Sequence, residues 1–188
     1  MSASPSRVAH AGIVGAAAQV FARLGFAATR VEDILGAAGI ARRTFYKAFS
    51  GKEEVLAAVY QLAIQELLGE MADAAEHAQA PLDILFRGID VYLDYHVTNA
   101  RLLRVLVEQA LRSDSPIYAA RRRFRAELVR LLDEAVRSTT GKEHDALLYL
   151  ALVSALEGVS LELLAGEPDA RAVARAKEVI REIVTKVL

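Results

Sequence analysis

Apolar residues recur at helical spacing along almost the whole chain, and helix start and stop residues lie in the breaks between these runs. In the first run the apolar face comprises Val8, Ile13, Ala17, Val20, Phe21 and Leu24. Gly25 follows directly, and a glycine at this place ends a helix by adopting a left-handed conformation. Strand-like alternation of apolar and polar residues does not recur. The pattern therefore predicts an all-α fold.

The start and stop residues divide the chain into about nine predicted helices. Thr29 and Glu32 form a capping-box pattern at the start of the second helix, and Pro81 and the pair Ser115-Pro116 indicate later starts. The predicted helices cover about residues 7–24, 29–38, 41–49, 52–77, 81–97, 99–112, 117–138, 143–165 and 169–188.

Composition narrows the class of protein further. The 188 residues include no Cys, which excludes a disulfide framework and Cys-ligated metal sites. The longest stretch without Lys, Arg, Asp or Glu, Val8–Ala22, is shorter than the roughly 18–20 residues of a membrane span, and we interpret it as a folded helix. We expect a cytoplasmic protein with no membrane partner.

The formal net charge of −1 hides an asymmetry. Residues 1–52 have a net charge of +5, with Glu32 and Asp33 as the acidic side chains; the remaining chain has a net charge of −6. The basic side chains of this first part are Arg7, Arg23, Arg30, Arg42, Arg43, Lys47 and Lys52. A basic end on an acidic body suggests that this end meets a polyanion.

Residues 29–52 predict a helix-turn-helix, because two short helices are joined by a turn that contains Gly39. The apolar side chains that can fix the angle between these helices are Ile34, Leu35, Ile40, Phe45 and Phe49. The outward side chains of the second helix are then Arg42, Arg43, Lys47 and Ala48. In this docking mode the second helix enters the DNA major groove, where Arg can bind guanine through two parallel hydrogen bonds.

Three further side chains suit phosphate contacts. Thr44 and Tyr46 carry hydroxyls, and Lys52 lies at a helix start, where free backbone N–H groups favour anions. Packing and capping are the alternative roles for Thr44 and Tyr46, and a solvated helix start is the alternative for Lys52.

The stretch from Phe21 to Leu56, FARLGFAATRVEDILGAAGIARRTFYKAFSGKEEVL, resembles the N-terminal domain of the TetR family of bacterial transcriptional regulators. The resemblance implies a three-helix DNA-binding domain at residues 1–52 and a helical effector-binding and dimerisation domain at residues 53–188. It implies phosphate contacts from Thr29, Thr44, Tyr46 and Lys52, and base or groove contacts from Arg42, Arg43 and Lys47. Two residues depart from the family pattern: Ala41 replaces a Ser or Thr cap, and Arg43 replaces a small residue.

The predicted helix at 143–165 is apolar nearly all round, so it must be covered on more than one side. Together with the last helix it could form a four-helix bundle between two chains, and the resemblance implies the same homodimer. The alternative is burial in the core of a single chain. The candidate dimer residues are Leu152, Leu156, Val159, Leu163, Val173, Ile180 and Val184.

Polar tips on otherwise apolar helices are candidates to line an effector pocket. They are Tyr92, Tyr95, His96, Tyr118, Tyr149 and Glu157. For each of them the alternative is an ordinary side chain whose polar tip is satisfied within the fold. A mostly apolar pocket would suit a small hydrophobic effector.

These observations predict a sequence-specific, DNA-binding transcriptional regulator: a repressor that a small hydrophobic effector releases from an inverted-repeat operator in double-stranded DNA. We expect no cofactor, no metal site and no enzyme activity, because the sequence lacks G-x-S-x-G, phosphate-loop and H-E-x-x-H motifs. The alternatives are a helical scaffold or adaptor that does not bind DNA and a helical-bundle enzyme.

Overall fold

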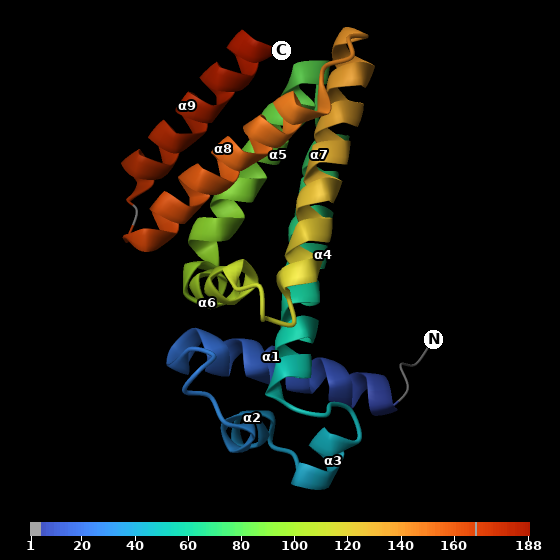
Figure 1. Ribbon diagram of the computed structural model, residues 1–188, viewed down its shortest axis with the longest axis vertical. Helices are drawn as coiled ribbons and strands as arrows, with labels where there is room; N and C mark the ends of the chain where they lie inside the picture. Colours follow the sequence, from blue (N-terminus) through green and yellow to red (C-terminus); the bar gives the residue numbers. More distant parts are fainter. Residues whose placement is uncertain (1–4, 168) are drawn as a thin grey trace. The chain divides into compact units, whose positions relative to one another are not determined.

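The computed structural model describes residues 5–167 and 169–188. In these residues the chain forms nine α-helices and no strand, which confirms the predicted all-α fold (Figure 1). The helices are α1 (Pro5–Leu24), α2 (Val31–Ala38), α3 (Arg42–Tyr46), α4 (Lys52–Glu76), α5 (Pro81–Thr98), α6 (Ala100–Leu111), α7 (Tyr118–Thr140), α8 (Ala146–Ala165) and α9 (Ala170–Val187).

The helices pack into two compact units. The N-terminal unit combines the chain up to Ile64 with Arg101–Arg121, and the C-terminal unit combines Gln65–Ala100 with Arg122–Leu188. Helix α4 begins in the N-terminal unit and ends in the C-terminal unit, so one continuous helix belongs to both.

Helix α2 begins two residues later than the predicted range. Its N-cap is Arg30, whose backbone N–H donates to the Asp33 carboxylate at 2.8 Å. The predicted capping box of Thr29 and Glu32 is wrong, because both side chains are used elsewhere. The Thr29 hydroxyl donates to the Gly25 carbonyl at 2.7 Å, and the Glu32 carboxylate forms an ion pair with Arg42.

Helix α3 is short, with five residues, and no side chain caps its start at Ala41. The turn before it is built around Gly39, whose φ of 64° is the left-handed conformation that glycine adopts without strain. By contrast, α8 and α9 begin with capping aspartates. Asp145 accepts from the Leu147 N–H and Asp169 from the Ala172 N–H, both at 2.7 Å.

The core of the N-terminal unit lies where α1 packs on α2 and α2 on α3. Fully or almost fully buried apolar side chains from α1 to α4 meet there, and they include Ile13, Ala17, Val20, Phe21, Ile34, Phe45, Phe49, Val55, Leu56 and Val59. This core fixes the short α3 in place, although five residues without a cap would not hold a helix alone.

In the C-terminal unit, α5, α8 and α9 pack against one another. Two ion pairs join α5 to α9: Asp94 with Lys177 at 2.6 Å, and Asp90 with Arg181. Helix α8 is long and apolar enough to cross a membrane by length and composition, and 33% of its apolar window is buried within the fold. A core helix of a soluble protein passes the same test, so this finding alone is weak evidence for a membrane span.

Candidate nucleic-acid interface and effector cavity

Helix α3 is held by aromatic side chains on its inner side. Phe45 is 0% exposed, and its ring centroid lies 5.9 Å from that of Phe49. The side chains of Arg42, Arg43, Tyr46 and Lys47 are exposed. The helix therefore presents three cations and a hydroxyl to solvent.

Arg42 is oriented by two neighbours. Its guanidinium forms an ion pair with Glu32 on α2 and lies 6.0 Å from the ring centroid of Tyr46. The Arg42 side chain is 63% exposed and the Glu32 side chain 57%, so solvent screens the pair and its net contribution to stability is small. Glu32 was not predicted as a site residue, because a carboxylate in the first turn of a helix is ordinary and carries no motif.

Lys52 joins the start of α4 to the turn between α1 and α2. Its ammonium donates to the carbonyls of Phe26, Ala27 and Thr29 at 3.0, 3.3 and 2.8 Å, and it lies 4.6 Å from the Phe26 ring centroid. Thr29 itself is 1% exposed. Thr29 and Lys52, two of the four predicted phosphate ligands, are thus engaged in internal hydrogen bonds.

Of the two predicted phosphate ligands on α3, Tyr46 is exposed and Thr44 is half-buried. The Thr44 backbone N–H donates to the Ala41 carbonyl at 2.9 Å, as part of the first turn of the helix. The DNA contacts assigned to Thr29, Arg42, Arg43, Thr44, Tyr46, Lys47 and Lys52 stay predictions.

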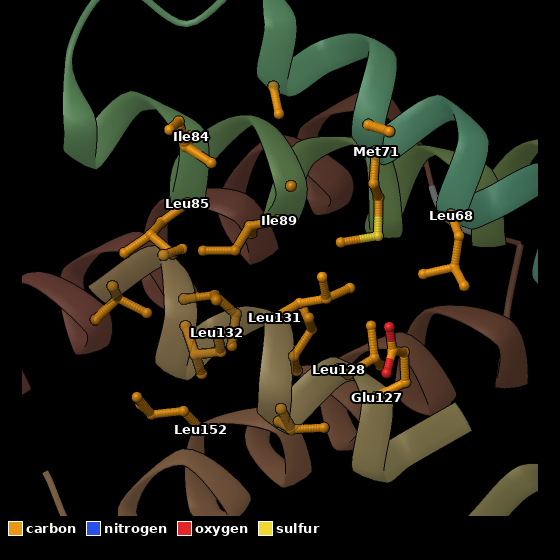
Figure 2. A pocket seen from close by; sticks show the side chains of 18 residues that line it. Leu68, Met71, Ile84, Leu85, Ile89, Glu127, Leu128, Leu131, Leu132 and Leu152 are labelled. Carbon is orange, nitrogen blue, oxygen red and sulfur yellow. The ribbon is translucent and has the colours of Figure 1, made fainter. Parts of the chain in front are cut away.

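The C-terminal unit encloses a cavity of about 330 Å³ between α4, α5, α7, α8 and α9 (Figure 2). This volume is within the range of small-molecule sites, roughly 300–1,000 Å³. Leucine, isoleucine, valine, alanine, methionine and glycine make up its lining, with one charged residue, Glu127, among the residues that the structure places there. The cavity can hold an apolar molecule with few polar groups.

Glu127 contributes a carboxylate to this lining, and its side chain is 39% exposed, so it lies at the mouth. Its two oxygens accept from Nε and Nη2 of Arg130 at 2.9 and 2.6 Å, and Arg130 also pairs with Glu134. The hydrogen bonds from Arg130 lower the pKa of Glu127 below its usual value. The carboxylate is therefore charged at neutral pH.

Residues 13–59 match the family model described as bacterial regulatory proteins, tetR family. This match contains α2, α3 and the start of α4, and so includes Arg42, Arg43 and Lys52. The match to the tetR family is limited to this segment.

Solved structures of TetR-type regulators share the fold over nearly the whole chain. A TetR-family regulatory protein from Rhodococcus RHA1 is 26% identical, with 97% of this chain and 98% of that chain covered and a TM-score of 0.71. The TetR-family regulator PfmR from Thermus thermophilus is 27% identical, with 94% and 96% covered and a TM-score of 0.63.

The fatty acid degradation regulator FadR from Bacillus halodurans is 21% identical, with 97% and 96% covered and a TM-score of 0.79. This likeness shows the fold alone. No curated protein matches the chain. Family and fold together support DNA-binding transcriptional regulation.

The six predicted pocket residues lie outside the lining of the cavity. Two of them form a stack on α5, where the ring centroids of Tyr92 and His96 are 4.2 Å apart. Nδ1 of His96 lies 2.7 Å from the Tyr92 carbonyl, which can only accept, so Nδ1 carries the proton. Burial lowers the pKa of His96.

The other predicted pocket residues have partners or positions of their own. The Tyr95 hydroxyl donates to Glu66 at 3.1 Å, and burial together with that carboxylate raises the pKa of Tyr95. Glu157 pairs with Arg125 at 3.0 Å. Tyr149 is buried, and Tyr118 is half-buried in the N-terminal unit. Contact of any of these residues with an effector stays a prediction.

The predicted dimer residues divide into two sets. Leu152, Leu156, Ile180 and Val184 line the cavity of their own chain, whereas Val159, Leu163 and Val173 are half-buried. The exposed apolar side chains of the same two helices are Leu147, at 70% exposure, with Leu150, Ile183 and Val187. Sequence reasoning missed this outer set because an all-apolar helix does not show which side faces inward.

Proposed function

We propose that this chain is a regulator of the TetR family: a cytoplasmic repressor that binds an inverted-repeat operator as a homodimer and is released by a small hydrophobic effector. DNA binding is assigned to residues 1–52, and effector binding and dimerisation to residues 53–188. The observation that carries the proposal is the outward surface of α3, where Arg42, Arg43 and Lys47 are exposed above the buried Phe45.

DNA recognition in this proposal follows from the chemistry of α3. Arg42 and Arg43 lie at the N-terminal end of the helix, the end that meets base edges in helix-turn-helix docking. Arg42 can exchange its screened partner Glu32 for guanine, and one such bidentate contact discriminates between bases by about 1–3 kcal/mol. Lys47 can contact bases or the groove, and Tyr46 can bind a flanking phosphate.

The homodimer is proposed from the exposed apolar face of α8 and α9. Leu147, Leu150, Ile183 and Val187 would be covered by the same face of a second copy, as in a four-helix bundle. Two α3 helices spaced roughly 34–36 Å apart could then enter successive major grooves, which is the geometry that an inverted repeat requires.

Release by the effector is proposed from α4. The end of this helix contributes Leu68, Met71, Ala72 and Ala75 to the cavity, and its first residue, Lys52, binds the turn before α2. A ligand that favours one position of α4 can therefore bias the unit that reads DNA. Coupling of this kind between two sites is typically about 1–3 kcal/mol.

The test is binding to the DNA that flanks the coding region, with scrambled DNA as competitor, over a series of salt concentrations. We expect specific binding at nanomolar protein concentration. We also expect affinity to fall steeply with salt, each phosphate contact adding about −0.9 to the log–log slope. Arg42→Ala should reduce the preference for the specific site.

The matched control is Arg175→Ala, which removes an exposed, ion-paired arginine from α9. If Arg42→Ala and Arg175→Ala bind the specific site equally well, α3 is not the reading helix. Sedimentation of the free protein tests the homodimer, and transcription in vitro from the bound promoter distinguishes repression from activation. A monomer in solution, or activation of the promoter, would contradict that part of the proposal.

A further inference from the structure

We propose that the cavity of the C-terminal unit selects an apolar cation, of the chemical class of a long-chain primary amine, over a fatty-acid carboxylate. This inference rests on the proposed function, because it names the class of effector for the same site. It is carried by the charge of the lining and by the position of Glu127 at the mouth.

The body of the ligand must be apolar. Side chains such as Leu68, Met71, Ile89 and Leu131 surround the space shown in Figure 2. Burying a polar group against them without a hydrogen-bond partner costs free energy, whereas burying methylene groups is favourable. A polar group on the ligand is therefore best placed at the mouth, beside Glu127.

The ion-paired group at Glu127 comprises two carboxylates and one guanidinium. Arg130 lies between the Glu127 and Glu134 carboxylates, so two negative charges share one positive charge. Arg130 supplies one hydrogen bond to each Glu127 oxygen, and a carboxylate can accept further donors. An ammonium group at the mouth gains a charge-assisted hydrogen bond from Glu127.

A carboxylate ligand meets the opposite condition. Among the residues that the structure places in the lining there is no Lys, Arg or His that could pair with it. Its charge would lie next to that of Glu127, where like charges repel and burial disfavours the ionised form. An alcohol of the same length lies between these cases, since its hydroxyl can donate to Glu127 without carrying charge.

The experiment measures binding of decylamine, decanol and decanoate to the full chain by calorimetry at neutral pH, at ligand concentrations below micelle formation. A primary amine is protonated under these conditions, as the lysine side chain is. We expect the amine to bind most tightly and the carboxylate most weakly. Equal or tighter binding of decanoate, or no binding of decylamine, would overturn the inference.

Three variants locate the effect. Glu127→Gln should weaken decylamine binding about tenfold and leave decanol binding nearly unchanged, because a hydrogen bond to a charged group is replaced by a neutral one. Glu134→Gln is the matched control: it removes the other carboxylate on Arg130 without changing the lining, and should have a much smaller effect. Ala75→Leu narrows the cavity and should weaken all three ligands.

The results separate this inference from the proposed function. If Glu127→Gln and Glu134→Gln change decylamine affinity equally, or if Ala75→Leu changes no affinity, the amine binds outside the cavity and the inference is wrong. If decylamine binds as expected but does not release the protein from operator DNA, the inference holds and the proposed release mechanism fails. If DNA binding is specific but decylamine does not bind, the inference is wrong and the proposed DNA binding stands.

Discussion

The two units of the chain use their apolar residues in opposite ways. In the N-terminal unit, Ile34, Phe45 and Phe49 are buried and hold a short helix whose polar face is exposed. In the C-terminal unit, leucines from several helices surround a cavity of about 330 Å³, so part of their surface faces empty space and not other side chains. The first unit exposes a polar helix face, and the second leaves a space among its apolar side chains.

In the proposed function, this difference separates the unit that reads DNA from the unit that binds the effector. A DNA-reading surface must keep its cations in register with the duplex, so its support has to be rigid. Side chains that line a cavity lack van der Waals contacts on one side, and a ligand can supply those contacts. We therefore expect substitutions of similar size to cost more stability in the N-terminal unit than around the cavity.

The largest expected effect is that of Phe45→Ala. Because Phe45 is completely buried beneath α3, truncation should destabilise the protein by about 3–5 kcal/mol and abolish specific DNA binding. Leu131→Ala is the truncation compared with it at the cavity; this side chain is smaller and half-buried, and its loss should cost about 2 kcal/mol. Urea unfolding measures both; equal costs would break the contrast between the two units.

Lys52→Met should destabilise the N-terminal unit by roughly 2 kcal/mol, because three carbonyls lose an ammonium donor while the apolar stem is kept. The same variant tests the phosphate contact predicted from the sequence. If Lys52 also binds DNA, the salt slope should become about 0.9 shallower. An unchanged slope together with lower stability would assign Lys52 to the internal bonds alone.

The sequence predicted the fold and the outward face of α3 because these depend on local signals. Gly25, Gly39 and Pro81 mark breaks between helices, and Phe45 and Phe49 show which side of α3 is buried. These signals depend on backbone conformation and on the spacing of residues within one or two helical turns.

The cavity could not be predicted in this way. Its lining consists mainly of leucines and other aliphatic residues, which look the same in sequence whether they fill a core or border a space. Polar tips such as those of Tyr95 and Glu157 were the visible candidates, yet they bind Glu66 and Arg125 within the fold. Side-chain packing between distant helices decides these outcomes, and it leaves no local pattern.

Gly39→Ala should cost about 1 kcal/mol, because a side chain is strained at the positive φ of this turn. Since the turn sets the direction of α3, DNA affinity should fall as well. Gly39→Asn is the control, because asparagine tolerates the left-handed conformation better. Equal losses of stability in the two variants would point to a cause other than backbone strain.

The smallest expected effects on stability come from replacing one helical glycine in each unit with alanine, and they compare the two units directly. Gly36 lies in α2 with no atom within 4 Å of an added Cβ, and Gly88 lies in α5, where the Cβ would meet Cε of Met71 at 3.5 Å. Both Gly→Ala variants should stabilise the protein by about 0.5–1 kcal/mol, because alanine loses less conformational entropy in a helix.

Ligand binding should distinguish these two variants. Gly88 lines the cavity, so its new methyl group takes space from a ligand, whereas the methyl group at Gly36 faces solvent. Thermal unfolding measures the shared stabilisation, and calorimetry with decanol measures the difference. Weaker decanol binding in Gly88→Ala alone would place the bound decanol beside α5. Equal decanol affinity in both variants would mean that the ligand does not use this part of the cavity.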